Sequence, residues 1–269
     1  MELRKKMPPK NTMIAIICCV VAACCFVYVL ADYMRKAREE QIYEEMRNTV
    51  ATEASEETEA VVLPEATETG TIFCDSVYDF EQLCEQNPDI YAWISVPGTQ
   101  VDYPVFQSET DNYYLDHNMD GSVGYPGTVY TNKCNAKDFS NYNTVLYGHN
   151  MGNGTMFGSL HSFEDETFFD ANDSIVVYTK DKCLTYQIYA AVKFSDEYIP
   201  AYYNVNTAEG MMTFLEALET CMDEPESHQR SGVMVTEEDH IITLSTCVKN
   251  ERSRRYLIIG KLIEEACYN

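Results

Sequence analysis

The chain has 269 residues and carries 19 basic against 43 acidic side chains, so its formal net charge is −24. Phosphate binding requires clustered Lys and Arg, and this balance argues against a nucleic-acid partner while favouring solubility and cationic partners. The globular part, about 190 residues, is long enough to bury roughly 70% of its unfolded surface. We therefore expect one folded domain.

The N-terminal residues have the pattern of a membrane anchor. A basic cytoplasmic segment (1–12) precedes an uncharged, mostly apolar run at 13–31. A helix of that length rises about 28 Å, near the thickness of a bilayer, and the cations predict a cytoplasmic N-terminus with the remainder outside the cell. The alternative is a cleaved signal, because Val29-Leu30-Ala31 is a small-residue site and Val21-Ala22-Ala23-Cys24 resembles a lipoprotein cleavage box. We prefer a single-pass anchor, because the run exceeds the about 7–15 residues usual for a signal.

Residues 32–71 connect this run to the globular part. Residues 32–47 are charged, with apolar side chains at helical spacing, and predict a juxtamembrane helix; a solvated spacer fits them equally well. Residues 50–70 are rich in Glu, Thr and Ala, which is typical of a disordered acidic linker. The folded catalytic domain is expected at 72–269.

From Ile72 onward, short β-branched or alternating runs are separated by Gly, Pro, Asn and Asp. Many short strands with little helix between them predict an all-β barrel or sandwich. We also expect a helix near 80–90, a short one within 156–169, and a longer one at 207–222 with a cap at Asn206 or Thr207. The predicted strands lie at 93–96, 101–105, 128–130, 144–147, 174–178, 185–192, 233–235, 241–246 and 256–263.

The chain contains 11 cysteines, some inside the N-terminal apolar run and an odd number beyond it. An odd number leaves at least one thiol free, and the spacings match neither a disulfide scaffold nor a zinc site. We expect mostly reduced, buried cysteines, and we predict no metal site and no cofactor. The cysteines beyond the apolar run are Cys74, Cys84, Cys134, Cys183, Cys221, Cys247 and Cys267.

The strongest chemical signal lies in the last two predicted strands. An apolar strand at 241–246 stops at Cys247, and after a polar turn a second strand, 256–262, is opened by Arg255. If the strands pair antiparallel around 249–254, Cys247 lies opposite Arg255 and both side chains project from one face. The sequence therefore predicts a thiol held beside a fixed cation.

A cysteine nucleophile also needs a base, and His149 is the best candidate. It follows the short strand predicted at 144–147, and strand ends are where a scaffold displays reactive groups. A neighbouring Cys and His make a nucleophile that neither makes alone. Separately, each residue type is more often structural than catalytic, so the hypothesis depends on the pair.

Together these residues resemble the sortases, most closely those of class B. The resemblance runs from about Val77 to Ile263, and several motifs in the right order are far more specific than any one of them. It implies a β-barrel of about eight strands with peripheral helices, including an N-terminal helix and one between the penultimate strands. The shared motifs are Tyr91–Thr99, Val101–Val105, Asn112–Leu115, Tyr147–Met151, Gly154–Leu160, Thr243–Cys247 and Arg255–Leu262.

The resemblance implies a membrane-anchored transpeptidase. Cys247, as a thiolate, would attack the Thr carbonyl of a sorting signal near the C-terminus of a secreted protein, and an amine would release the thioacyl enzyme. His149 would protonate the leaving amine and deprotonate the incoming one. Arg255 would donate to the developing oxyanion, together with backbone amides beside Cys247. Arg252 and Arg254 compete for this role, but Arg255 opens the strand as the family's arginine does.

For substrate contacts the resemblance suggests Ser245, Tyr198, Ile199, Asn112 and Leu115. Ordinary packing is an equally good interpretation of Tyr198 and Ile199. The remaining histidines lie outside the shared motifs and are interpreted as surface or core residues. They are His117, His161, His228 and His240.

Several functional alternatives stay open. The acceptor amine belongs either to a peptidoglycan precursor, which we prefer, or to a lysine of a pilin subunit. The chain could instead be a cysteine peptidase that hydrolyses its thioester. A third possibility is a non-enzymatic, wall-proximal binding module, and labelling with a thiol-reactive probe distinguishes that case.

Overall fold

The computed structural model describes residues 10–51, 72–74 and 78–268, which divide into one unit up to Glu45 and a second from Met46. Helix α1 (Lys10–Ala51) begins in the first unit. Its segment Asn11–Met34 is long and apolar enough to cross a membrane, and an N-terminal signal sequence has the same properties. The helix continues through the charged residues predicted as juxtamembrane helix. Most of the predicted basic segment (1–9) and the acidic linker (52–71) lie outside the described residues.

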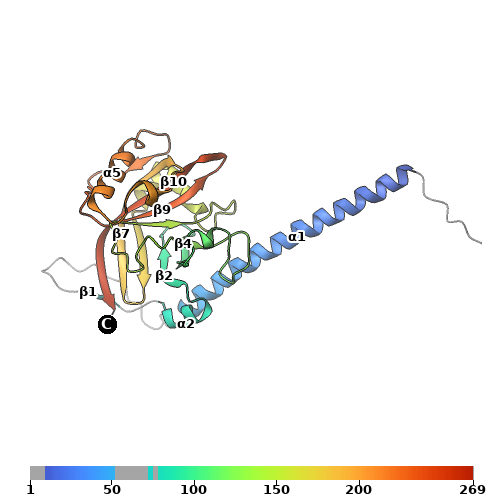
Figure 1. The fold of residues 1–269 in the computed structure, drawn as a ribbon, viewed down its shortest axis with the longest axis horizontal. Helices are drawn as coiled ribbons and strands as arrows, with labels where there is room; N and C mark the ends of the chain where they lie inside the picture. Colours follow the sequence, from blue (N-terminus) through green and yellow to red (C-terminus); the bar gives the residue numbers. More distant parts are fainter. Residues whose placement is uncertain (1–9, 52–71, 75–77, 269) are drawn as a thin grey trace, which may run out of the picture. The chain divides into compact units, whose positions relative to one another are not determined.

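Within the described part of the second unit, eight strands form a closed β-barrel (Figure 1). Their order is β10-β9-β5-β4-β3-β2-β6-β7, and pairing between β7 and β10 closes the ring. The pairs β3–β4 and β5–β9 are parallel. The predicted eight-stranded barrel is therefore confirmed. Its strands are β2 (Ile90–Ser95), β3 (Asp102–Phe106), β4 (Val129–Thr131), β5 (Asn143–Tyr147), β6 (Ser174–Thr179), β7 (Lys182–Ser195), β9 (Ile241–Val248) and β10 (Glu251–Tyr268); β1 (Ile72–Cys74) and β8 (His228–Gln229) pair outside the ring.

Burial along the strands follows from this closure. In β6 buried and half-buried residues alternate, as expected for a strand with one face on the barrel interior. In β5 and β9 nearly every residue is buried, and Val145 and Ile241 belong to the hydrophobic cluster that includes α5 residues. A strand buried on both faces has little freedom to shift, so the ends of β5 and β9 are firmly placed.

Helix α5 (Ala208–Glu219) lies in the connection between β7 and β9, beside the β7 and β10 side of the barrel (Figure 1). The Thr207 hydroxyl caps its first turn, as predicted. Met211, Phe214 and Leu218 form its buried stripe, whereas Met212 is exposed. The other helices of the described chain include α2 (Phe80–Gln86), η1 (Tyr113–Leu115), η2 (Gly158–Glu164), α3 (Glu166–Ala171) and α4 (Ile199–Tyr202).

The strand predicted at 233–235 does not form. Gly232 has a φ of +85°, and the N–H of Val233 donates to the Arg230 carbonyl at 3.4 Å, so the chain turns there. Val233 and Val235 pack on the hydrophobic cluster around α5, while Met234 between them is exposed. The β-branched pattern therefore reflects two side chains that anchor a turn.

The register between β9 and β10 places Cys247 directly opposite Arg255, as predicted. The connection is shorter than the predicted 249–254 turn, because Glu251 already pairs with Val248. Residues 252–254 then form an irregular bulge before regular pairing resumes. This bulge sets the point at which Arg255 enters the ladder.

The cysteines differ from the expectation in one respect. None of the cysteines whose side chains are described is fully buried. In the second unit, aromatic and branched aliphatic side chains fill the barrel interior instead. Cys247 is exposed.

Candidate active site

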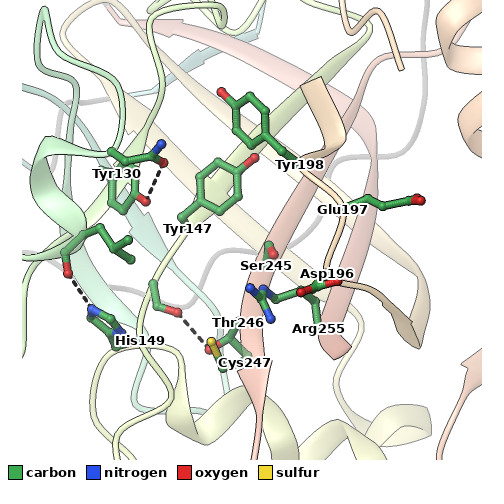
Figure 2. A pocket seen from close by; sticks show the side chains of 13 residues that line it. Tyr130, Tyr147, His149, Asp196, Glu197, Tyr198, Ser245, Thr246, Cys247 and Arg255 are labelled. Atoms are coloured by element: carbon green, nitrogen blue, oxygen red, sulfur yellow. Dashed lines mark hydrogen bonds between the residues drawn. The ribbon is translucent and has the colours of Figure 1, made fainter. Parts of the chain in front are cut away.

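A cavity of about 260 Å³ opens where β5 and β9 end and β10 begins (Figure 2). Every residue predicted for the site lines it except Ile199. The remaining lining residues were not predicted from the sequence. Together the lining consists of Asn112, Leu115, Tyr130, Tyr147, Gly148, His149, Asp196, Glu197, Tyr198, Ser245, Thr246, Cys247 and Arg255.

The parallel pairing of β5 with β9 brings His149 and Cys247 to the same edge. Tyr147 pairs with Ser245, so two residues further along each strand places the histidine and the cysteine side by side at the end of the ladder. Two bonds extend the pairing past the strand: Gly148 N–H donates to the Ser245 carbonyl at 3.2 Å, and Thr246 Oγ1 donates to the Gly148 carbonyl at 2.8 Å.

Gly148 has a steric reason to lack a side chain. A Cβ there would lie 2.7 Å from the ring of Phe157. That ring is fully buried, and the Phe157 N–H donates to the His149 carbonyl at 3.0 Å. Close packing of this loop against the barrel therefore fixes the backbone that carries His149.

His149 is held by its Nε2, which lies 2.6 Å from the Leu115 carbonyl oxygen. A carbonyl can only accept, so Nε2 carries the proton and Nδ1 is the basic nitrogen. Burial lowers the pKa of His149, and the Leu115 carbonyl and the Asp116 charge offset part of that shift. The Tyr125 ring, 4.7 Å away between centroids, covers one side of the imidazole. In the free enzyme the neutral imidazole is thus favoured.

Arg255 reaches the pocket on the side of Cys247 that faces away from His149 (Figure 2). Its Nη1 donates to the carbonyls of Arg252 and Arg254, at 3.2 and 3.0 Å. These two acceptors belong to the bulge that precedes regular pairing, so the bulge also orients the guanidinium. Its other N–H groups remain available to the pocket.

The competing arginines are placed differently. Arg254 Nη2 lies 2.8 Å from Glu224 Oε1, in an ion pair away from the pocket lining. Arg252 is exposed in the bulge. Among the three arginines, Arg255 alone lines the cavity.

Three tyrosines form one wall of the cavity. The rings of Tyr130 and Tyr147 stack at 5.5 Å, and those of Tyr147 and Tyr198 at 6.2 Å. Burial raises the pKa of each phenol well above its usual range, so all three are neutral hydrogen-bonding groups. Asn112 accepts from the Tyr130 hydroxyl at 3.2 Å, and the Tyr198 hydroxyl accepts from Asn132 at 2.8 Å.

The Tyr147 hydroxyl is different from its neighbours. It is buried and has no hydrogen-bond partner among the residues that the structure describes. An unpaired buried hydroxyl is costly, so a group in the cavity could supply its missing partner. The sequence offered one signal for this residue, because Tyr147 immediately precedes the Gly148-His149 pair.

Ile199 is a correction to the predicted site. Its side chain is 2% exposed and belongs to the hydrophobic cluster with Phe214 and Leu218. Ile199 begins α4, which turns it inward while its neighbour Tyr198 faces the cavity. Packing is thus the role of Ile199, and cavity lining that of Tyr198.

Asp196 and Glu197 were not predicted from the sequence. They line the pocket near Arg255 (Figure 2), and nothing in their local pattern distinguishes them from surface carboxylates. Among the described residues, no group of three or more His, Cys, Asp or Glu side chains is placed to hold a metal ion.

Comparisons with known proteins show which sequences and structures this chain resembles. A sequence model of the sortase domain matches residues 94–263. Sortase B of Listeria monocytogenes is 30% identical over 191 residues, which cover 70% of this chain and 74% of the relative. Sortase B of Staphylococcus aureus is 31% identical over 189 residues, which cover 69% and 75%.

Solved structures with a similar fold are also sortases of class B. Clostridium perfringens sortase B has a TM-score of 0.62 at 28% identity, with 69% of this chain and 100% of that chain covered. A Staphylococcus aureus sortase B–substrate complex has a TM-score of 0.66 at 25% identity, covering 86% of this chain and 99% of that chain.

Proposed function

Because this chain belongs to the sortase family, as a class B cysteine transpeptidase, we propose that Cys247, His149 and Arg255 carry its chemistry on the C-terminal sorting signals of secreted proteins. The observation that supports this most directly is the cross-strand pairing of Cys247 with Arg255, beside His149 in a single cavity. An exposed thiol between a base and a fixed cation is the arrangement that nucleophilic acyl transfer needs.

The reaction begins with a proton transfer from the Cys247 thiol to Nδ1 of His149. The thiolate then forms a bond to the carbonyl carbon of the scissile peptide, and the carbonyl π electrons move onto oxygen. When the tetrahedral intermediate collapses, the C–N bond breaks and His149 gives its proton to the leaving amine. The acyl group remains on Cys247 as a thioester. An incoming amine reverses these steps: it attacks the thioester, loses its proton to His149 and expels the thiolate.

Arg255 stabilises the oxyanion in both halves of the reaction. The Arg252 and Arg254 carbonyls hold the guanidinium before substrate arrives, so little reorganisation is needed as charge develops. A guanidinium stays protonated near neutral pH, which makes it a hydrogen-bond donor to the oxyanion and not a proton source.

The tyrosine wall and its neighbours bind the sorting signal. Tyr147 offers its unpaired hydroxyl, and Tyr198, Asn112, Leu115 and Ser245 line the same cavity. The flat, neutral rings suit an extended peptide backbone, with hydroxyl and amide groups spaced along it. One solved relative, sortase B of Staphylococcus aureus, is a substrate complex, which supports a sorting-signal substrate here.

We further propose that the acceptor is the amine of a peptidoglycan precursor; a pilin lysine is the second candidate. The apolar segment of α1 supports a single-pass membrane anchor with the N-terminus in the cytoplasm and the domain at 72–269 outside the cell. In that position the enzyme meets secreted proteins as they emerge.

The test uses purified full-length chain in detergent, a panel of sorting-signal peptides and two kinds of amine. Cleavage with accumulation of an acyl adduct on Cys247, followed by transfer to the amine, supports the proposal. Cys247→Ala should abolish both cleavage and transfer, and turnover by that variant would exclude the assignment. Cleavage without transfer to either amine would instead indicate a peptidase.

A further inference from the structure

His161 contacts the nucleophile's main chain from outside the cavity. Its Nε2 lies 3.0 Å from the Cys247 carbonyl oxygen, and its side chain is only 18% exposed. From its sequence context His161 was interpreted as a surface or core residue, and it does not line the cavity that holds His149. A second, polar groove, also lined by Asn150, Glu164 and Lys193, lies on this side of the β9 end.

The position of His161 follows from the local helix. His161 and Glu164 are three residues apart in η2, where three residues per turn bring their side chains together. Nδ1 of His161 lies 2.6 Å from Glu164 Oε1. The imidazole also stacks on the ring of Tyr256, with centroids 5.1 Å apart. Tyr256 follows Arg255 in β10 and pairs with Thr246. The imidazole of His161 therefore packs on the hairpin that carries the nucleophile.

The two ring nitrogens of His161 have different surroundings. Nδ1 donates to the Glu164 carboxylate, which accepts. Nε2 lies 3.0 Å from the Cys247 carbonyl oxygen and 2.9 Å from Nδ2 of Asn150. When Nε2 carries a proton it donates to the carbonyl, and when it does not it accepts from the Asn150 amide. In both protonation states His161 belongs to the polar group that surrounds the Cys247 carbonyl.

Asn150 completes the arrangement. Its Nδ2 donates to the same Cys247 carbonyl at 2.9 Å. The carbonyl oxygen has two lone pairs, so it accepts from Asn150 and, when Nε2 carries a proton, from His161 as well. Because Asn150 follows His149 directly, this amide also ties the loop of the base to the strand of the nucleophile. Regular β5–β9 pairing ends at Tyr147 and Ser245, so such contacts hold the strand end where the ladder no longer does.

We propose that His161 is a positioning residue for the nucleophile: with Glu164 behind it and Asn150 beside it, it fixes the Cys247 main chain at the end of β9. The proposal rests on the catalytic role of Cys247 proposed above. An imprecisely held thiol would lose alignment with His149 and Arg255, which affects the chemical steps more than peptide binding.

Two substitutions separate positioning from general support. The amide nitrogen of His161→Gln falls near the place of Nε2 and can still donate to Cys247. That of His161→Asn falls near Nδ1 and can reach only Glu164. His161→Phe keeps the stacked ring and loses both ring nitrogens. His240→Phe is the control, because His240 also stacks on a tyrosine and contacts a carbonyl, at the opposite end of β9.

For the full-length enzyme in detergent, we expect His161→Phe and His161→Asn to lower kcat about tenfold with KM within about twofold, as for the loss of one hydrogen bond at the nucleophile's main chain. His161→Gln should stay within about threefold of the parent, and His240→Phe should match the parent. Equal kcat for the Gln and Asn variants, or a better Asn variant, would overturn the proposal even if His161→Phe fails to fold.

A second readout distinguishes this proposal from the proposed function. The rate of Cys247 alkylation by iodoacetamide requires no peptide, and it should fall in the Phe and Asn variants but not in the Gln variant. If alkylation follows that order while the parent cleaves no sorting peptide, the proposed function fails and the positioning role stands. If Cys247→Ala abolishes peptide cleavage while His161→Phe changes neither kcat nor alkylation, the positioning role fails alone.

Discussion

Substitution of the three arginines at the start of β10 tests the proposed oxyanion contact. Arg255 faces the cavity, and two carbonyls engage only its Nη1. Loss of one oxyanion donor typically costs about 10²–10³ in rate, which corresponds to about 3–4 kcal/mol of transition-state stabilisation. Arg255→Ala should therefore lower kcat by that factor. Arg255→Lys should remain poor, because a compact ammonium cannot reproduce the fork of the guanidinium.

Arg254→Ala is the matched control, since it removes the same side chain one residue away. The Arg254–Glu224 ion pair is partly solvated, and such pairs contribute about 0–1 kcal/mol to stability. Its loss leaves the cavity unchanged, so kcat should stay within several-fold of the parent. Arg252→Ala should behave in the same way, because that residue is exposed in the bulge.

The assay measures kcat and KM for each variant on one quenched fluorescent sorting peptide with one amine acceptor, alongside the midpoint of thermal unfolding. Because the contact strengthens as charge develops, the Arg255 defect should appear mainly in kcat. A crippled Arg254→Ala enzyme with a near-normal Arg255→Ala enzyme would refute the reasoning. It would mean that the bulge at 252–254 re-forms in solution with the opposite residue facing the thiol.

Three further predictions follow from the site and the chain organisation. Burial lowers the pKa of His149, so on acidification the unfolded chain takes up this proton near pH 6.5, whereas the folded chain takes it up only at lower pH. The free energy of unfolding should therefore fall below about pH 6.5, and it should fall less steeply in His149→Gln. Denaturant titrations at several pH values measure this. Tyr147→Phe removes a buried unpaired hydroxyl, so the free enzyme should be at least as stable, while KM for the peptide rises about 5–10-fold; an unchanged KM would argue against a substrate contact. The domain at 72–269 should unfold cooperatively without the anchor and linker, and aggregation of that fragment would show that the boundary is misplaced.

The sequence by itself determined the features that depend on neighbours along the chain. The hairpin of β9 and β10 is local, so its β-branched runs and polar turn were enough to set Cys247 opposite Arg255. The cap at Thr207 and the stripe of α5 are likewise local. The apolar length of the first part of α1 follows from composition alone.

The tertiary structure decided what depends on segments far apart. Parallel pairing of β5 with β9 cannot be read from either strand, yet it brings His149 beside Cys247. Local pattern likewise does not show that Ile199 turns into the core while Tyr198 faces the cavity. A hydrogen bond between His161 and the Cys247 carbonyl leaves no periodic signal. Hydrophobic periodicity reports which face of an element is buried, whereas a polar site depends on which distant elements the closed barrel brings together.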